Sequence, residues 1–145
     1  MACRVSSYFK HDRGMVKLIL RINVVIMLLW GCVSQIFASV KPQGDGSKDC
    51  PFRITKPAEL QYFAAVVNGS DDNIPQNRDA CAVLMNDIDL SAVCGKTLGS
   101  WIPIGYTEET SFHGVFDGRN HRIDNIYINK ASQMGQGLFG IVRKG

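Results

Sequence analysis

The chain has 145 residues, the length of one domain, and carries 16 Lys and Arg against 13 Asp and Glu. Five of the basic and one of the acidic residues lie within residues 1–38, which leaves 11 basic against 12 acidic residues, a net charge of about −1, for the remainder. Because that remainder has no basic patch interleaved with aromatic residues, its composition excludes nucleic acid as an expected partner.

Residues 1–38 have the composition of a secretory signal peptide. Basic residues precede a short apolar run, Ile22 to Trp30, and small residues follow it. The apolar stretch is about half as long as the roughly 20 residues that a membrane-spanning helix needs, so export is favoured over a permanent anchor. A second methionine, Met15, is followed by the more usual short basic region and is an alternative start.

Two ways of processing the signal peptide stay open. Ala38 is a suitable last residue for ordinary cleavage. Alternatively, Leu29–Cys32 resembles a bacterial lipobox, which would make Cys32 a lipidated N-terminus. Both routes carry the product out of the cytoplasm, so we expect it to be secreted or held at the cell surface or outer membrane.

One helix is expected, from Pro57 to Val67. Pro57 suits the first helical position, where no backbone N–H is needed, and Asn68-Gly69 is a stop signal. The apolar residues between them recur at helical spacing and form one stripe, which indicates a helix laid over a β core. This helix and the polar loop after it form the predicted capping segment, 54–80, which follows a solvated linker, 39–53.

The predicted β region covers residues 81–145. Short apolar segments, spaced by roughly a dozen residues, are bounded there by Gly, Asp or Asn. Such spacing is typical of a sandwich, a barrel or a solenoid and does not separate them. The predicted strands are Ala82–Met85 with Ile88, Trp101–Ile104, Phe112–Phe116, Arg122–Ile128 and Leu138–Val142.

The cysteines are interpreted as disulfide partners, because an exported protein folds in an oxidising compartment. Cys81 and Cys94 flank one predicted strand and turn, and a bridge between them would contribute roughly 3 kcal/mol. Cys50 would then be unpaired, or it would bond Cys81 instead. No group of Cys and His residues has the spacing of a zinc site, so no metal is expected.

The segment from Trp101 to Gly140 carries the most specific pattern of the chain. It contains W-I-P-I-G, then F-H-G-V-F-D-G-R-N-H-R-I-D-N-I-Y-I, then G-L-F-G. These motifs resemble the repeat unit of GLUG-motif proteins, and the resemblance covers roughly residues 54–142. The matching positions are Trp101, Pro103, Ile104, Gly105, Phe112, Gly114, Phe116, Asp117, Gly118, His121, Ile123, Ile128, Gly137, Leu138, Phe139 and Gly140.

The resemblance implies an all-β fold, the start of a right-handed parallel β-helix (a solenoid) with an N-terminal capping helix. It also implies a secreted or surface bacterial protein, in a family that includes adhesin-like proteins, IgA-specific metallopeptidases and carbohydrate-active enzymes. Inward-facing strand residues would stack as the core, and about three repeats are usually needed for stability. The expected core residues are Ile104, Phe116, Ile123, Ile126, Ile128, Leu138 and Phe139.

The polar and glycine residues of the motif are interpreted as structural. Asp117-Gly118 fits a sharp corner, with Gly118 at positive φ and the Asp117 side chain bonding nearby backbone N–H groups. His113 and His121 would project from different strands, which argues against joint acid–base chemistry. The aspartates of N-D-I-D-L predict a capped turn rather than a calcium site. Four further glycines would let the chain turn between faces: Gly105, Gly114, Gly137 and Gly140.

We therefore expect no catalytic, cofactor-binding or metal-binding residue in the chain. The predicted function is that of a non-catalytic scaffold or adhesin-like segment of an exported bacterial surface protein, in contact with carbohydrate or surface proteins. The alternative is the N-terminal scaffold of a secreted enzyme, polysaccharide-degrading or a metallopeptidase, whose catalytic region follows residue 145. The pattern still runs at Gly145, which predicts further β-helix repeats of the same parent chain and an open last coil prone to self-association.

Overall fold

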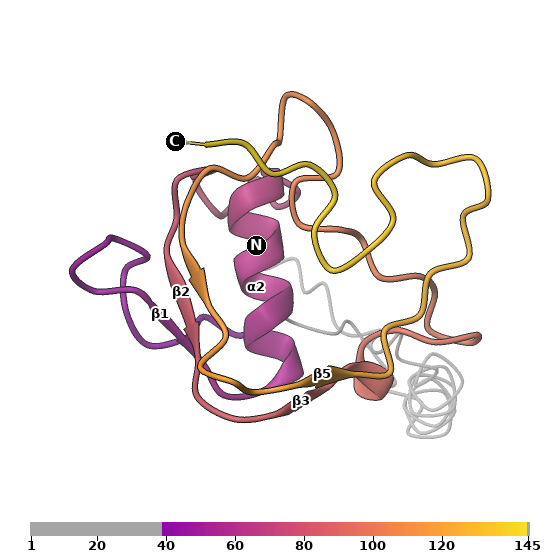
Figure 1. The fold of residues 1–145 in the computed structure, drawn as a ribbon, viewed down its shortest axis with the longest axis horizontal. Coiled ribbons are helices and arrows are strands. Elements are labelled where there is room, and N and C mark those ends of the chain that lie inside the picture. Colours follow the sequence, from indigo (N-terminus) through magenta and orange to yellow (C-terminus); the bar gives the residue numbers. More distant parts are fainter. Residues whose placement is uncertain (1–38, 145) are drawn as a thin grey trace, which may run out of the picture. The chain divides into compact units, whose positions relative to one another are not determined.

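The computed structural model describes residues 39–144. The predicted signal peptide, the alternative start at Met15 and the lipidation site at Cys32 lie outside the described residues. In chain order the elements are β1 (Phe52–Ile54), α2 (Pro57–Asn68), β2 (Ala82–Leu84), β3 (Ile88–Asp89), the 3₁₀ turn η1 (Leu90–Ala92), β4 (Phe116–Asp117) and β5 (Ile123–Asp124). Figure 1 shows β1 and β2 beside α2, and β3 next to β5.

The helix α2 confirms the predicted start at Pro57 and ends one residue beyond the predicted end. Near its start, the buried Glu59 carboxylate accepts hydrogen bonds from the N–H (2.7 Å) and the hydroxyl (2.8 Å) of Thr55. After its last turn, Gly69 adopts the left-handed conformation (φ 61°) and donates its N–H to Ala65 C=O at 2.9 Å. The helix has 12 residues, and within residues 39–144 no helix is long and apolar enough to cross a membrane.

All pairs between the named strands run parallel. β2 lies between β1 and β4 in a three-stranded sheet, with Phe52 opposite Ala82 and Ala82 opposite Phe116. β3 and β5 form a second sheet, in which Ile88 lies opposite Ile123. Parallel neighbours need a crossover connection, so each contact joins residues that are far apart in the chain.

The predicted all-β, right-handed parallel β-helix is wrong. Residues 39–144 form a helix and two small sheets, of three and two strands, and they do not close into a solenoid. The predicted strands Trp101–Ile104 and Leu138–Val142 form an isolated bridge at Ile104 and Phe139 instead of a continuous ladder. Short apolar segments predict where strands can form, but the Gly and Asn residues between them interrupt the ladders before a regular coil is built.

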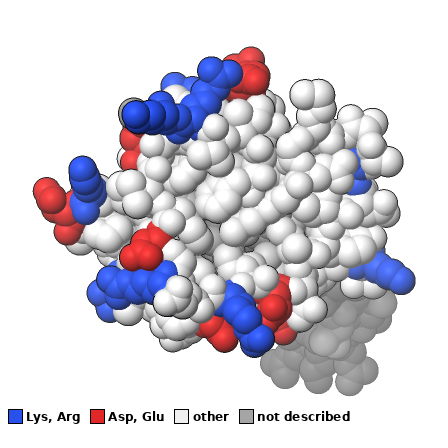
Figure 2. Space-filling model, in the orientation of Figure 1, with Lys and Arg blue, Asp and Glu red and all other residues white. Residues whose placement is uncertain are grey.

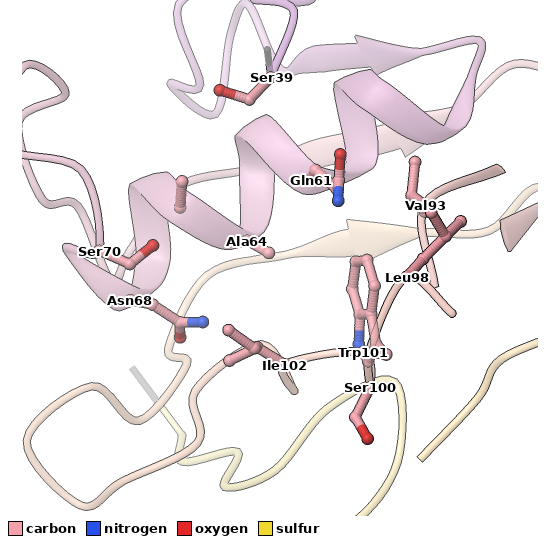
Figure 3. A pocket seen from close by; sticks show the side chains of 11 residues that line it. Ser39, Gln61, Ala64, Asn68, Ser70, Val93, Leu98, Ser100, Trp101 and Ile102 are labelled. Carbon is pink, nitrogen blue, oxygen red and sulfur yellow. The ribbon is translucent and has the colours of Figure 1, made fainter. Parts of the chain in front are cut away.

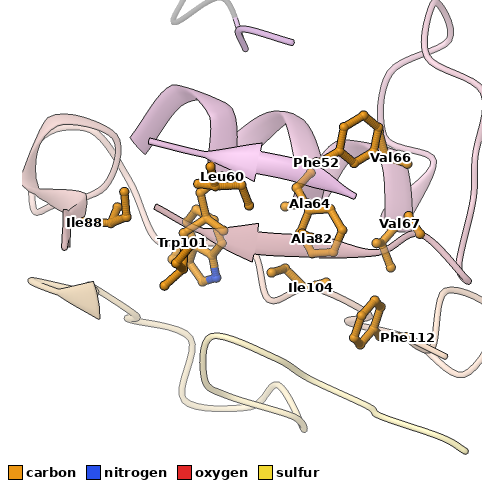
Figure 4. Close-up of a cluster of buried hydrophobic side chains, with 14 of the residues drawn as sticks. Phe52, Leu60, Ala64, Val66, Val67, Ala82, Ile88, Trp101, Ile104 and Phe112 are labelled. Carbon is orange, nitrogen blue, oxygen red and sulfur yellow. The ribbon is translucent and has the colours of Figure 1, made fainter. Parts of the chain in front are cut away.

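The core lies between α2 and the strands. Leu60 and Val67, which Figure 4 shows, and Phe63 belong to the predicted apolar stripe of α2 and are fully buried. The Phe63 ring contacts aromatic rings of two distant segments, Phe52 at 6.4 Å and Phe112 at 5.8 Å between centroids. One helical side chain therefore joins the first strand to the segment that leads into β4.

Six of the seven expected core residues contact the core. Ile104 is fully buried, whereas Ile126 is 39% exposed and its prediction is wrong. The reason is its neighbour Asn125, which has positive φ (58°) and so breaks the alternation of an extended strand. The other five are partly buried against the core: Phe116, Ile123, Ile128, Leu138 and Phe139.

The predicted disulfide between Cys81 and Cys94 is absent, and both residues are buried free thiols. Cys94 Sγ accepts a hydrogen bond from Tyr127 N–H at 3.3 Å, whereas Cys81 Sγ lies 3.7 Å from Asp79 C=O. Because each sulfur is held against a different stretch of backbone, the two do not meet. Cys50 is an exposed free thiol, so neither predicted pairing is present.

Candidate functional site

The W-I-P-I-G turn is fixed to the end of α2 by one buried side chain. Asn68 donates from Nδ2 to Pro103 C=O at 3.1 Å and accepts at Oδ1 from Gly105 N–H at 2.8 Å. Both atoms of this buried amide are therefore occupied. The clamp places Trp101 and Ile102 opposite one face of the helix (Figure 3).

A hollow of about 300 Å³ lies between α2 and residues 93–102 (Figure 3). The helix contributes Gln61, Ala64 and Asn68, which follow one another at intervals of three and four residues and so share one face. The methyl group of the central alanine leaves room that a larger side chain would fill. The facing wall consists of Val93, Leu98, Ser100, Trp101 and Ile102.

The polar side chains of Trp101, Ser100 and Gln61, which line this hollow, differ in their hydrogen bonds. Trp101 Nε1–H donates to Leu138 C=O at 3.2 Å, and Ser100 Oγ accepts from Asn129 N–H at 2.9 Å. Gln61 Oε1, by contrast, is buried and lacks a hydrogen bond within the described part of the chain. A ligand in the hollow would meet the Gln61 amide nitrogen, which points toward Trp101, and not this buried oxygen (Figure 3).

The chemistry of the hollow is neutral. Among the described residues that line it, none is charged. Gln61, Ser70 and Ser100 contribute amide and hydroxyl groups, while the exposed Leu98 and Ile102 contribute apolar surface. Small-molecule sites of about 300–1,000 Å³ combine apolar walls with a few polar groups in this way. The hollow therefore fits a small uncharged molecule with both hydroxyl groups and an apolar face.

Sequence reasoning did not predict this hollow. Its local signal is the row of small and polar residues Gln61, Ala64 and Asn68, which lies beside the apolar stripe of α2. That row indicates a second face of the helix, but it does not predict which segment of the chain packs opposite that face. The facing segment, 93–102, comes some 30 residues later, and the Asn68 contacts hold the turn that directly follows it.

A serine, a histidine and an aspartate also lie close together. Ser111 Oγ is 3.0 Å from His113 Nε2, and His113 Nδ1 is 3.8 Å from Asp79 Oδ1. The order of these groups is that of a nucleophile, a base and an orienting acid. Ser111 is only 1% exposed, however, and 3.8 Å is longer than a hydrogen bond. A substrate does not reach Ser111 in this arrangement, which favours a structural interpretation of His113.

His121 connects two segments that precede strands. Its Nδ1 lies 3.1 Å from Asp87 Oδ1, and the same oxygen accepts from Arg122 N–H at 3.0 Å. The backbone hydrogen bond from Arg122, followed by the side-chain bond from His121, holds the pKa of Asp87 below its ordinary value. Because Asp87 precedes β3 and Arg122 precedes β5, this contact fixes the start of the second sheet.

The other aspartate of N-D-I-D-L forms the predicted capped turn. Asp89 Oδ1 accepts from Ser91 N–H at 2.9 Å and caps η1. The Asn125 amide donates to the same oxygen at 2.9 Å. The Asn125 hydrogen bond, and after it those from Ser91, lower the pKa of Asp89.

The corner at Asp117-Gly118 is confirmed in part. Asp117 Oδ1 accepts from Arg119 N–H at 3.0 Å, as the sequence predicts. The positive φ angles fall one and two residues later than predicted, at Arg119 (45°) and Asn120 (61°), and not at Gly118. The Asp117 hydrogen bond stabilises Arg119 in this turn. Arg119 therefore adopts a positive φ angle, which is more common for glycine.

The motif glycines lie mainly where backbones approach closely. A Cβ on Gly114 would lie 2.0 Å from Ala80 C=O, and one on Gly140 would lie 2.6 Å from Gly105 C=O. Gly105 itself has positive φ (73°). A Cβ on Gly137 would lie 3.1 Å from a carbonyl oxygen within its own turn. The apolar motif residues lie in or against the core: Trp101, Ile104, Phe112, Phe116, Ile123, Ile128, Leu138 and Phe139.

The charged residues of the described part of the chain are spread over its surface in both signs. In residues 39–144 no three His, Cys, Asp or Glu side chains are grouped as metal ligands would be. On the face shown in Figure 2, acidic and basic side chains alternate around the rim, and the broad centre is uncharged. This face therefore has no large patch of a single sign that would attract a highly charged partner.

No known protein family matches the chain, and no solved structure is significantly similar to it. A "Putative Gly-rich membrane protein" of Evansella cellulosilytica is 30% identical over 120 residues, which cover 81% of this chain and 12% of that protein. "Halomucin" of Haloquadratum walsbyi is 27% identical over 100 residues, which cover 68% of this chain and 1% of that protein. The chain thus spans a small part of the length of these curated relatives, and the resemblance to GLUG-motif proteins stays a prediction.

Proposed function

We propose that residues 39–144 form a non-catalytic scaffold of an exported surface protein, and that this scaffold binds a neutral sugar in the hollow between α2 and residues 93–102. The observation that carries the proposal is a hollow of about 300 Å³ whose described lining is uncharged and into which the Gln61 amide nitrogen points (Figure 3). A sugar hydroxyl can accept a hydrogen bond from this nitrogen.

The shape and composition of the hollow support a sugar over other small molecules. An anion or a cation would find no opposite charge among the described lining residues, so its desolvation would be uncompensated. A purely apolar ligand would leave Gln61 and Ser100 facing it without new partners. A sugar ring offers hydroxyl groups for these residues and C–H surface for Leu98 and Ile102, and about 300 Å³ suits a small ligand.

The surface location has independent support. One relative is named a membrane protein and the other a halomucin, and residues 1–38 of this chain have the pattern of a signal peptide. A protein outside the cytoplasm meets polysaccharides and glycoproteins, which carry neutral sugars. Location and pocket chemistry therefore favour the same class of ligand.

The test is a binding screen of the exported protein on immobilised neutral mono- and oligosaccharides, followed by calorimetric titration with the sugar that is best retained. Gln61→Ala removes the hydrogen bond proposed here, which contributes about 1 kcal/mol, so we expect affinity to fall roughly fivefold. The matched control is Gln133→Ala, because Gln133 is not among the residues that line the hollow.

The outcomes are distinct. Retention of a neutral sugar, with weaker binding by Gln61→Ala and unchanged binding by Gln133→Ala, supports the proposal. Failure to retain any neutral sugar, or equal effects of both substitutions, contradicts it. Circular dichroism of each variant checks that the helix is intact, since Gln61 lies within α2.

A further inference from the structure

A second hollow, the β1 hollow, lies against a different face of α2. It has a volume of about 420 Å³ and is enclosed by the helix, by β1 and by the loops of residues 41–45 and 74–77. The helix contributes Tyr62 and Val66, which are four residues apart and therefore share one face. Among the described residues, none lines both this hollow and the one shown in Figure 3, so the two are separate.

The inner wall of the β1 hollow is apolar. Phe52 and Val66 are buried, and the Tyr62 ring packs edge-on against the Phe52 ring, with 5.9 Å between their centroids. Ile74 and Pro75 add apolar surface from the loop on the opposite side. The contact with Phe52 fixes the orientation of the Tyr62 ring, so this wall offers an ordered surface to an apolar group of a ligand.

Backbone hydrogen bonds hold both loops against this wall. Arg53 N–H donates to Gln43 C=O at 2.8 Å, which keeps residues 41–45 beside β1. On the other side of the hollow, Asn77 N–H donates to Val66 C=O at 2.9 Å and keeps the second loop against the helix. Because these contacts lie within the protein, the β1 hollow does not depend on a ligand for its shape.

Two opposite charges line the β1 hollow without neutralising each other. Lys41 takes part in none of the ion pairs formed within residues 39–144, so it is not paired with Asp45. Asp45 Oδ1 accepts a hydrogen bond from Ser47 N–H at 2.8 Å. The hydrogen bonds from Ser47, and to a smaller extent the charge of Lys41, lower the pKa of Asp45, so its carboxylate is ionised at neutral pH. The hollow therefore combines an ammonium and a carboxylate with an apolar wall.

We propose that the β1 hollow binds a small zwitterion with an apolar side chain, namely an aliphatic α-amino acid. The ligand carboxylate pairs with the Lys41 ammonium, and the ligand ammonium pairs with the Asp45 carboxylate. The aliphatic side chain of the ligand lies against Tyr62 and Ile74. Since the two hollows share no lining residue, this site does not rest on the sugar site proposed above.

Ligands with a different charge pattern fit the β1 hollow less well. A simple anion would be repelled by Asp45, and a simple cation would be repelled by Lys41. A neutral apolar ligand would displace water from both charged groups without giving either a partner. A zwitterion supplies an opposite charge for each group, and its apolar side chain covers the wall that water otherwise contacts.

The test is calorimetric titration of the exported protein with leucine at low ionic strength, where exposed charges are least screened. Leucine methyl ester lacks the carboxylate and N-acetyl-leucine lacks the ammonium, so we expect each to bind about tenfold more weakly than leucine. Lys41→Gln and Asp45→Asn should each weaken the binding of leucine about fivefold. Asp45→Asn keeps a side-chain oxygen for Ser47 N–H, so this substitution changes the charge and leaves the turn in place.

Lys48→Gln and Asp49→Asn are the matched controls, because they remove the same charges at nearby exposed positions that do not line the hollow. Both controls should bind leucine as the parent protein does. Failure to bind leucine, equal binding of leucine and its two derivatives, or equal effects of the controls would overturn the proposal. So would weaker binding of leucine by Gln61→Ala with unchanged binding by Lys41→Gln, since leucine would then occupy the other hollow.

Discussion

Residues 52–104 and residues 112–144 contain similar apolar side chains but bury them to different extents. In the first region Ile54, Leu60 and Phe63 are fully buried, because α2 and the strands pack against each other. In the second region Phe116 and Phe139 are only partly buried, and Val115 is exposed. The contrast shows that here burial depends on having neighbours on both sides, and not on the hydrophobic pattern of a segment.

The largest expected effect compares one aromatic ring from each region. Phe63→Ala should lower the free energy of unfolding by about 3–5 kcal/mol, because it removes a fully buried ring that contacts Phe52 and Phe112. Phe139→Ala should lower it by less than half as much, because Phe139 is partly buried. Urea denaturation measures both, and equal losses would remove the distinction between the regions.

The next effect concerns the clamp between α2 and the W-I-P-I-G turn. Asn68→Ala leaves Pro103 C=O and Gly105 N–H unpaired in a buried site, so we expect a loss of about 2–3 kcal/mol. Asn129→Ala is the matched control, since Asn129 is exposed and its contact with Ser100 uses only the backbone N–H. Thermal unfolding of the two variants should differ clearly, and similar midpoints would show that the clamp is weak.

A pair of glycines tests the backbone contact between the regions. Gly114→Ala would bring a Cβ within 2.0 Å of Ala80 C=O, so strand β4 must shift and we expect a loss of about 1–3 kcal/mol. Gly118→Ala meets no heavy atom within 4 Å and lies outside the positive-φ positions, so its effect should stay within about 0.5 kcal/mol. A tolerated Gly114→Ala would mean that β4 is loosely held against β2.

The smallest effect is the pH dependence of the contact between Asp87 and the residues before β5. The pKa of Asp87 is lowered by the hydrogen bonds from Arg122 and His121, so the ionised carboxylate is favoured in the folded state. Its contribution to stability is present above the ordinary pKa of 3.8 and is lost as the pH falls through the lower folded value. Between about pH 5 and pH 2, the melting temperature of Asp87→Asn should therefore fall less than that of the parent protein. Parallel curves would show that Asp87 does not stabilise the contact between the residues before β3 and those before β5.

Local features of the sequence predicted local features of the structure. Pro57 and Gly69 bound the helix, and Asp89 and Asp117 accept the turn hydrogen bonds expected of them. Each of these contacts joins residues within a few positions of one another, so the residue types alone decide them. The failure at Gly118 is of a different kind, because the Asp117 contact moves the positive φ to the next residues.

The features that the sequence did not predict depend on contacts over 30 residues or more. Cys94 is held by the backbone of Tyr127, 33 residues later, and the strands from residue 101 onward pair too briefly to build a solenoid. The hollow beside Gln61 exists because Asn68 holds a distant turn. Spacing and composition describe each segment, but they do not say which segment lies opposite it.

The most direct test of the difference between the two regions is hydrogen exchange at two backbone amides. Ala82 N–H is buried and donates to Val115 C=O, whereas Phe116, which lies opposite Ala82, directs its N–H away from β2 because successive residues of a strand alternate. Ala82 N–H should exchange at least 100-fold more slowly than Phe116 N–H. Equal exchange of the two amides would contradict the account.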